Sequence, residues 1–413
     1  MMLSVRSWDD LCAAGGGFFR RLFVLANCVV FAWSTTSTCQ DGIEQNGIAM
    51  NDIDESYMRE ALRIAEYARG RTAPNPLVGA VIVRDGTIVA NGWHRAAGEP
   101  HAEIHALRMA GELARGATLY VTLEPCAHHG RTGPCAEAVI AAGIARVVVA
   151  LRDPNPLVAG RGIALLEAAG IEVVTDILAE EARRQNEVFL KWITTKRPFV
   201  TLKMAMTLDG KIASHAGVSQ WITGEDARAR VHEYRDVNDA ILVGIGTVLA
   251  DNPRLNVRAF PTLRQPARIV LDSKLQTPLG SHMVSDDLSP TIIVTAVDDE
   301  ERLKPYHAFS HIRILRSSEN ADGRIDLAAL LPQLAELGYG EIMVEAGVTL
   351  TSAFIESGLA DEIVLYQAPK ILGEGRSLLT LSANPAVLAS EGEWESRSVE
   401  LIGQDVKWVL RKK

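Results

Sequence analysis

The stretch EPCAHHGRTGPC at residues 124–135 constrains this chain more than any other part of its sequence. With His101 upstream, Cys126 and Cys135 supply one imidazole and two thiolates, a donor set that suits zinc. Three protein ligands leave one position for water, which is typical of a catalytic zinc site. Zinc lowers the pKa of such a water to about 7, and Glu103 is the candidate that carries its proton to the leaving group.

The spacing of His101 and Glu103 sets a condition on the local structure. Residues two positions apart point to different sides of a helix interior. We therefore expect His101 at a helix N-terminus, directly after the Gly-Glu-Pro at residues 98–100, where the dihedral angles are not yet helical. Pro134 likewise predicts that Cys135 lies in the first turn of its helix, where free N–H groups and the helix dipole favour a thiolate.

Three other interpretations of these residues stay open. His105, four positions after His101, could be the ligand in its place, although it fits a packed helix residue better. His128 or His129 could supply a fourth ligand and close the site. The open site is favoured because Glu103 has no task in a closed one. Cysteines that are merely buried would leave the flanking prolines and glycines unexplained.

Charge and cysteine content narrow the class of protein. The formal net charge is −9 with no run of four Lys or Arg, which argues against a nucleic-acid groove, whereas a few arginines suffice for a small anionic ligand. Five cysteines in 413 residues are no disulfide scaffold and fit a reducing cytosol, so we expect a cytoplasmic protein.

Residues 1–49 do not read as part of the fold. The stretch FFRRLFVLANCVVFAW resembles the core of a signal peptide and is too short to span a bilayer. An upstream extension is the favoured alternative, because an exported enzyme would have to keep Cys126 and Cys135 reduced.

The rest of the chain reads as α/β, and its length suggests two or three domains. From Leu77 the order is β-β-α-β-α-β-α-β, which predicts a sheet covered by helices, with a hairpin turn at Asp85 and Gly86. Pro198 and the charged cluster before it mark a boundary, so the expected domains are residues 50–195 and 196–413.

The second half is also predicted to alternate strands with helices. Thr223 and Asp226 predict a capping box at the start of one helix. Buried strands are expected at residues 199–206, 240–244, 267–272, 291–295, 341–347 and 361–369, and two final strands are expected at 398–403 and 406–411.

The opening motif also carries a family resemblance. His-Ala-Glu followed by Pro-Cys is the signature of zinc-dependent cytidine and nucleobase deaminases. The longer form PCAHHGRTGPC, with APNPLVGAVIV (73–83) and GEPHAEIHAL (98–107), resembles the pyrimidine deaminase of riboflavin biosynthesis. The resemblance runs from about Asp54 to Lys413 and implies a cytidine-deaminase-like three-layer domain, with Asn75 orienting the pyrimidine ring. Gly133 departs from the pattern, which has a second proline there, and this affects the stiffness of the loop more than the chemistry.

The stretches LKMAMTLDGKIA, SQWIT, GIGTVLADNPRLNVR, RIVLDS, VEAG and APKILG resemble the reductase domain fused to that deaminase. This resemblance implies a dihydrofolate-reductase-like α/β fold with NADPH as the hydride source. The cofactor contacts that it implies are Ala205, Trp221, Thr247, Asp251, Ser273, Gly347, Val348, Thr349, Leu350, Thr351, Ser352 and Ala353. The substrate contacts that it implies are Lys203, Ser219, Arg235, Leu255, Arg258 and Glu345.

The residue types in this half agree with those roles but do not prove them. Arg235 and Arg258 could clamp a phosphate through paired N–H groups. A solvated face is the alternative for both, and more so for Arg235, which lies on an otherwise charged helix. Glu345 can accept bonds from ribose hydroxyls, and Lys203 can polarise the sugar carbon that receives hydride. Gly347, which opens a helix after a buried strand, predicts a phosphate seat made of free backbone N–H groups.

Together these features predict a bifunctional enzyme whose partner is a small phosphorylated pyrimidine. Its first domain would deaminate 2,5-diamino-6-(ribosylamino)-4(3H)-pyrimidinone 5′-phosphate with Zn²⁺, and its second would reduce the ribosyl chain of the uracil product with NADPH and no metal. We expect a homo-oligomer that binds neither nucleic acid nor membrane. The alternatives are a nucleoside or tRNA deaminase with an accessory nucleotide-binding domain, and a zinc-stabilised binding protein.

Overall fold

A five-stranded sheet organises the first half of the computed structural model, which describes residues 50–127, 133–154, 159–381 and 392–413. Its helices are α1 (Met50–Ala65), α2 (Ala102–Ala110), α3 (Cys135–Ala141), α4 (Arg161–Ala168), α5 (Ala179–Gln185) and α6 (Glu187–Thr195). Its strands are β1 (Gly79–Arg84), β2 (Thr87–Trp93), β3 (Thr118–Leu123), β4 (Arg146–Leu151) and β5 (Glu172–Thr175), in the spatial order β2-β1-β3-β4-β5. The predicted alternation from Leu77 is confirmed, whereas the extension at 1–49 lies outside the described residues.

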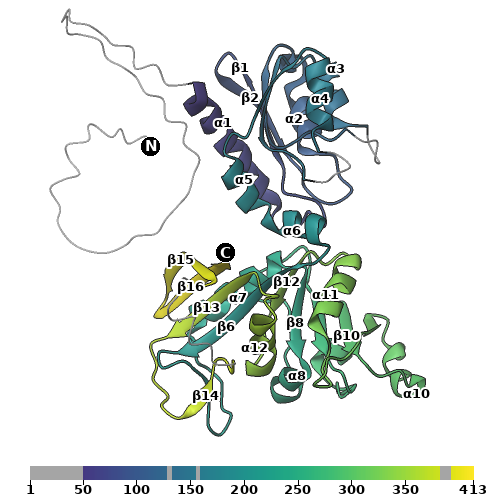
Figure 1. Cartoon of the computed structure of the whole chain (residues 1–413), viewed down its shortest axis with the longest axis vertical. Coiled ribbons are helices and arrows are strands. Elements are labelled where there is room, and N and C mark those ends of the chain that lie inside the picture. The colour runs from purple at the N-terminus through teal and green to yellow at the C-terminus, as the bar shows by residue number, and fades with distance from the viewer. Residues whose placement is uncertain (1–49, 128–132, 155–158, 382–391) are drawn as a thin grey trace, which may run out of the picture. The chain divides into compact units, whose positions relative to one another are not determined.

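This sheet is the middle of three layers. Helices α1 and α5 cover one face, and α2, α3 and α4 cover the other (Figure 1). Because both faces are covered, the central strands are apolar throughout, and Val81, Val121 and Val149 are completely buried. The hairpin between β1 and β2 is confirmed, with Asp85 and Gly86 both at positive φ (50° and 73°), as a two-residue type I′ turn requires.

A nine-stranded sheet organises the second half. Its strands are β6 (Phe199–Thr207), β8 (Ala240–Gly244), β9 (Ala267–Leu271), β10 (Thr291–Thr295), β11 (Ile312–Arg316), β12 (Glu341–Val344), β13 (Glu362–Ala368), β15 (Trp394–Ile402) and β16 (Asp405–Lys412). A separate two-stranded sheet pairs β7 (Lys211–Ser214) with β14 (Gly375–Ser377). The spatial order is β11-β10-β9-β8-β12-β6-β13-β16-β15, parallel as far as β13 and antiparallel thereafter.

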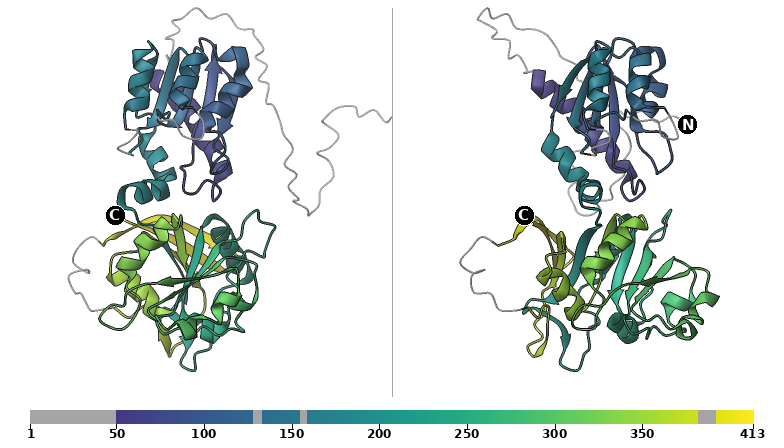
Figure 2. Two further views of the ribbon diagram at one scale, coloured as in Figure 1. Left: turned by 90° about the vertical axis from the view of Figure 1, so that its right-hand side faces the viewer. Right: turned by 45° about the vertical axis from the view of Figure 1, so that its right-hand side comes forward.

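Helices cover both faces of the larger sheet (Figure 2). They are α7 (Glu225–Val237), α8 (Ile245–Asp251), α9 (His282–Ser285), α10 (Glu300–Leu303), α11 (Leu327–Glu336) and α12 (Val348–Glu356). Leu330 of α11 and Phe354 of α12 pack against one face, and Val231 of α7 and Val248 of α8 pack against the other. The carboxyl ends of the parallel strands therefore meet at one edge between two helical layers, where ligands bind in open α/β sheets.

The capping box predicted at Thr223 and Asp226 is wrong. Helix α7 begins at Glu225 with Gly224 as its N-cap, and no N-cap side chain closes it. The N–H of Gly224 instead donates to Oδ2 of Asp405 at 2.7 Å. Asp405 is 181 residues away in β16, so a tertiary partner has replaced the local one.

Among the described residues, no helix has the length and hydropathy that a membrane span needs.

Candidate active site

His101, Cys126 and Cys135 come together in the first half of the chain. Their candidate ligand atoms all lie within 4.8 Å of one another. His101 is the N-cap of α2 with extended dihedral angles (φ −72°, ψ 165°), and Cys135 is the first residue of α3 after the N-cap Pro134. Both predicted placements at helix N-termini are confirmed.

The spacing within this cluster fits a tetrahedral metal ion. Nδ1 of His101 lies 3.2 Å from Sγ of Cys135 and 3.6 Å from Sγ of Cys126. Zinc–nitrogen and zinc–sulfur bonds of ordinary length place two tetrahedral ligands about 3.5 Å apart. A hydrogen bond from the Cys135 side chain, together with bonds from His101 and the Cys135 N–H, lowers the pKa of Cys126 to about 4. This favours the thiolate form that a metal requires.

Glu103 lies next to the cluster as the second residue of α2. Only 3% of its surface is exposed, and its Oε2 atom has no hydrogen-bond partner among the described residues. Burial raises the pKa of Glu103 to about 7. An unpartnered buried carboxyl oxygen is costly for stability, which makes it a candidate for a catalytic role.

The structure tests one of the alternative ligands, His105, and does not support it. His105 does not belong to the group of three candidate ligands, and its Nε2 atom is buried without a partner. His128 and His129, the possible fourth ligands, lie outside the described residues.

A cavity of about 250 Å³ opens in front of the cluster. Its lining includes Asn75, as predicted, and Asn75 Nδ2 lies 3.0 Å from Nε2 of His94. The sequence analysis did not identify His94 or Asp153, which also line the cavity. It also missed the three side chains that α6 contributes, which are Phe189, Trp192 and Ile193. No motif in the sequence around His94 or Asp153 marks either residue as part of the site.

Glu124 anchors the backbone beside the metal ligands. It is 4% exposed, and its two carboxylate oxygens accept four backbone N–H groups, from Asp153, Gly160, Gly162 and Ile163 at 2.9–3.3 Å. Gly162 is required at its position because a Cβ atom there would lie 1.9 Å from the carbonyl oxygen of Pro125. Asp153, Gly160 and the first turn of α4 are thus held against the segment that precedes Cys126.

A second polar cluster lies in the larger sheet. Arg235 makes a two-pronged ion pair with Glu345 (Nε–Oε1 2.6 Å, Nη2–Oε2 2.9 Å) and donates from Nη1 to the carbonyl of Asn256. It is 9% exposed, so the solvated-face alternative for Arg235 is wrong. Burial lowers the pKa of Lys203, although Glu345 favours its charged form. Arg258 is the more exposed of the two arginines, and its N–H donates to Nδ1 of His232.

The predicted cofactor contacts follow the carboxyl ends of neighbouring strands. Ser273 follows β9, Thr247 and Asp251 lie in α8 after β8, and the segment 347–353 follows β12. Gly347 is the N-cap of α12, and a Cβ atom there would meet no atom within 4 Å, so the space beside the start of the helix is open. Free N–H groups at the start of a helix suit a phosphate.

The remaining predicted contacts differ in exposure. Trp221 is 61% exposed beneath the guanidinium of Arg228 (4.5 Å to the ring centroid). Leu255 is 3% exposed, and Thr351 and Ser352 are also buried. Thr351 donates its hydroxyl to the Ala346 carbonyl, and the Ser352 hydroxyl accepts the N–H of Thr380. The side chains of Thr351 and Ser352 are therefore engaged within the protein, and the Thr351 N–H donates to the Gly347 carbonyl at 3.2 Å.

Comparison with known proteins agrees with both sites. Residues 51–151 match the family model of the cytidine and deoxycytidylate deaminase zinc-binding region, and residues 198–408 match the RibD C-terminal domain. Riboflavin biosynthesis protein RibD of Escherichia coli (strain K12) is 45% identical over 86% of this chain and 98% of its own length, and that of Aquifex aeolicus (strain VF5) is 44% identical over the same shares.

Solved structures give the same answer. Acinetobacter baumannii RibD has a TM-score of 0.79 at 38% identity and covers 88% of this chain and 99% of its own. A Thermotoga maritima protein described as a diaminohydroxyphosphoribosylaminopyrimidine deaminase/5-amino-6-(5-phosphoribosylamino)uracil reductase has a TM-score of 0.78 at 36% identity, with the same coverage. With a cytidine-deaminase-like domain followed by a reductase domain, this chain belongs to the RibD family of riboflavin biosynthesis proteins.

Proposed function

We propose that this chain catalyses two successive steps of riboflavin biosynthesis. The first is hydrolytic deamination of 2,5-diamino-6-(ribosylamino)-4(3H)-pyrimidinone 5′-phosphate. The second is reduction of 5-amino-6-(5-phosphoribosylamino)uracil to the ribityl product with NADPH. The observation that carries the first step is the cluster of His101, Cys126 and Cys135 beside the buried carboxyl of Glu103, whose Oε2 atom has no hydrogen-bond partner among the described residues.

In the first domain, His101, Cys126 and Cys135 would hold Zn²⁺. Bound zinc activates water for attack on an electrophilic carbon at neutral pH. Glu103 accepts a proton from the attacking water and passes it to the departing amino group, so that the C–N bond breaks and ammonia leaves as a neutral molecule. Asn75, whose side-chain amide is fixed by His94, orients the pyrimidine ring in the cavity.

In the second domain, the proposal assigns substrate to the Lys203–Arg235–Glu345 cluster and cofactor to the ends of β8, β9 and β12. NADPH, when bound, supplies the hydride. Lys203 polarises the sugar carbon that accepts it, and Glu345 accepts hydrogen bonds from ribose hydroxyls. Because Glu345 and Asn256 already engage Arg235, we assign the phosphate mainly to Arg258 and give Arg235 the role of fixing Glu345.

The remaining parts of the proposal concern organisation. We place the domain boundary between residues 195 and 196, in the connection from α6 to β6, and assign residues 1–49 to an extension. A cytoplasmic location suits a site that needs reduced thiolates. A homo-oligomer is supported by β15, where Val399 and Leu401 are 63% and 77% exposed on the outermost strand of the larger sheet, since apolar edge strands are normally covered. The net charge of −9 supports small-molecule substrates over nucleic acid.

The test is to supply the zinc-loaded protein with the diaminopyrimidine phosphate and NADPH, and to follow ammonia release and nicotinamide absorbance. Glu103→Gln should keep its zinc and lose about 10²- to 10⁴-fold in deamination rate, the usual contribution of a general acid–base. The same variant should reduce the uracil intermediate at the wild-type rate. Deamination by Glu103→Gln at the wild-type rate would remove Glu103 from the mechanism.

A further inference from the structure

The deaminase cavity has one wall that neither matched family model includes. The models end at residue 151 and begin again at residue 198, so α6 lies between them. Three α6 side chains, Phe189, Trp192 and Ile193, line the cavity that also contains His101 and Glu103. Their spacing of i, i+3 and i+4 places them on one face of the helix.

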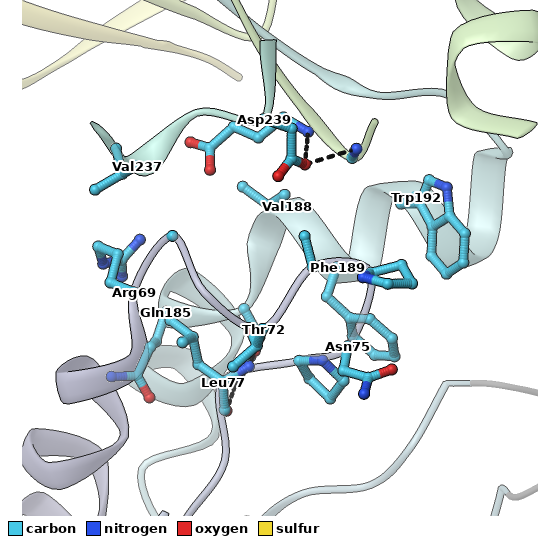
Figure 3. A pocket seen from close by; sticks show the side chains of 17 residues that line it. Arg69, Thr72, Asn75, Leu77, Gln185, Val188, Phe189, Trp192, Val237 and Asp239 are labelled. Atoms are coloured by element: carbon cyan, nitrogen blue, oxygen red, sulfur yellow. Dashed lines mark hydrogen bonds between the residues drawn. The ribbon is translucent and has the colours of Figure 1, made fainter. Parts of the chain in front are cut away.

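Helix α6 is held firmly enough to serve as a wall. Phe189 and its neighbour Leu190 pack against the hydrophobic core of the five-stranded sheet. Figure 3 shows Phe189 close to Asn75 and Trp192 one turn further along the helix. The smaller hollow in that view, of about 60 Å³, shares Asn75, Phe189 and Trp192 with the deaminase cavity, so these side chains separate the two spaces.

The cavity is chemically two-sided. The metal-ligand cluster, Glu103 and Asp153 give one side its polar and charged atoms, whereas α6 gives the other an aromatic and aliphatic surface. The described lining contains no lysine or arginine, so a phosphate finds no cationic partner among these residues. The part of a ligand that fits both sides is a flat heteroaromatic ring with a polar edge, which an aromatic side chain can contact through its π-face.

We propose that Trp192, supported by Phe189 and Ile193, is the specificity wall of the deaminase: it contacts the face of the pyrimidine ring and presents the edge bearing the amino group to Glu103. This inference rests on the proposed deaminase function. It assigns ring recognition to a segment beyond the zinc-binding region itself.

Trp192 also makes two contacts outside the cavity, and the experiment has to distinguish their effect from contact with the pyrimidine ring. Its indole Nε1 donates to the carbonyl of Ala335 at 3.4 Å, and the ammonium of Lys196 lies 5.6 Å from the ring centroid. Trp192→Phe keeps an aromatic face and loses the indole donor, whereas Trp192→Ala loses both. A stacking role predicts that phenylalanine largely substitutes for tryptophan, and a purely structural role predicts that both variants behave alike.

The experiment compares Trp192→Ala, Trp192→Phe and Ile193→Ala in the zinc-loaded full chain. Val188→Ala is the matched control, because Val188 lies on α6 and lines the smaller hollow but not the deaminase cavity. Trp192→Ala should raise the KM of deamination about tenfold, the order expected for loss of one base–aromatic stack, and should lower kcat less. Reduction of the uracil intermediate by the same preparation should stay within twofold of wild type and reports on folding.

A second readout does not depend on turnover. In the Glu103→Gln background, calorimetry with the diaminopyrimidine phosphate should show about tenfold weaker binding when Trp192→Ala is added. Little change should follow when Trp192→Phe or Val188→Ala is added. If Trp192→Ala binds as tightly as its parent, or if Val188→Ala weakens binding equally, the wall is not a specificity element. If Trp192→Ala does not fold, the binding affinities of Ile193→Ala and Val188→Ala are compared in its place. The wall is a specificity element only if Ile193→Ala weakens binding more than Val188→Ala does. Wild-type protein that releases no ammonia contradicts the proposed function instead.

Discussion

Replacement of Glu124 by glutamine should loosen the deaminase domain without touching a metal ligand. Each carboxylate oxygen of Glu124 accepts two backbone N–H groups, from Gly162 and Ile163 at Oε1 and from Asp153 and Gly160 at Oε2. An amide keeps one accepting oxygen and turns an NH₂ donor toward the other two N–H groups. Two hydrogen bonds to a charged group are therefore lost in a buried setting.

The expected magnitude follows from those two bonds. Hydrogen bonds to charged groups contribute about 1.5–3 kcal/mol each. Whichever oxygen is replaced, the lost pair contains one of the longer bonds, 3.3 Å at Oε1 or 3.2 Å at Oε2, which favours the lower end. The free energy of unfolding should therefore fall by about 3 kcal/mol. For a domain of this size each kcal/mol shifts the melting temperature by about 2–4 °C, which gives a shift of about 6–12 °C.

Thermal inactivation of the two activities in one sample is the assay. The midpoint for deamination should drop by that amount in Glu124→Gln, and the midpoint for reduction should not move. Glu167→Gln is the matched control, since Glu167 is exposed on the same α4 helix that Glu124 anchors. A Glu124→Gln midpoint within 2 °C of wild type would refute the view that the four N–H bonds stabilise the deaminase domain, because a loss of about 3 kcal/mol would shift the midpoint by more than that.

Three further predictions concern metal, packing and pH. Removal of zinc by a chelator should abolish ammonia release and leave NADPH oxidation with the uracil intermediate unchanged. Added zinc should restore ammonia release. Loss of both activities would contradict two separate active sites. Gly162→Ala should destabilise the deaminase by about 1–3 kcal/mol and weaken zinc retention in a competition assay, because its Cβ would lie 1.9 Å from the carbonyl oxygen of Pro125. Gly133→Ala is the control, and it should change neither stability nor zinc retention because a Cβ atom there meets open space. Burial, with Arg235 and Arg258 nearby, lowers the pKa of His232 to about 4. The unfolded chain then binds the extra proton between about pH 6.5 and 4, so the free energy of unfolding should fall by up to about 3 kcal/mol across that window, and His232→Gln should flatten this part of the curve in denaturant titrations.

The zinc cluster could be predicted from sequence because every determinant is local. His101 follows a Gly-Glu-Pro segment and Cys135 follows Pro134, and both short patterns fix where a helix begins. The alternation of strands and helices from Leu77 could be predicted for a similar reason, since the central strands β1, β3 and β4 are mostly apolar runs.

The errors involve partners that are distant in sequence. Thr223 carried a good capping pattern, yet Asp405 supplies the bond at the start of α7. Arg235 sits on a helix that is otherwise charged, so its burial against Glu345 was not visible in the helix pattern. The side chains at 189, 192 and 193 have the spacing of any core-facing helix, and only the fold shows that this face borders a cavity.

The bond from Gly224 to Asp405 has a practical consequence for engineering. Asp405 begins the strand that pairs with both β13 and β15, and the same residue fixes the first turn of the helix that carries Arg235. Deletion of residues 403–413, or insertion of a tag within them, should therefore displace Arg235 and impair reduction. A tag added after Lys413 should leave the strand pairing of β16 intact.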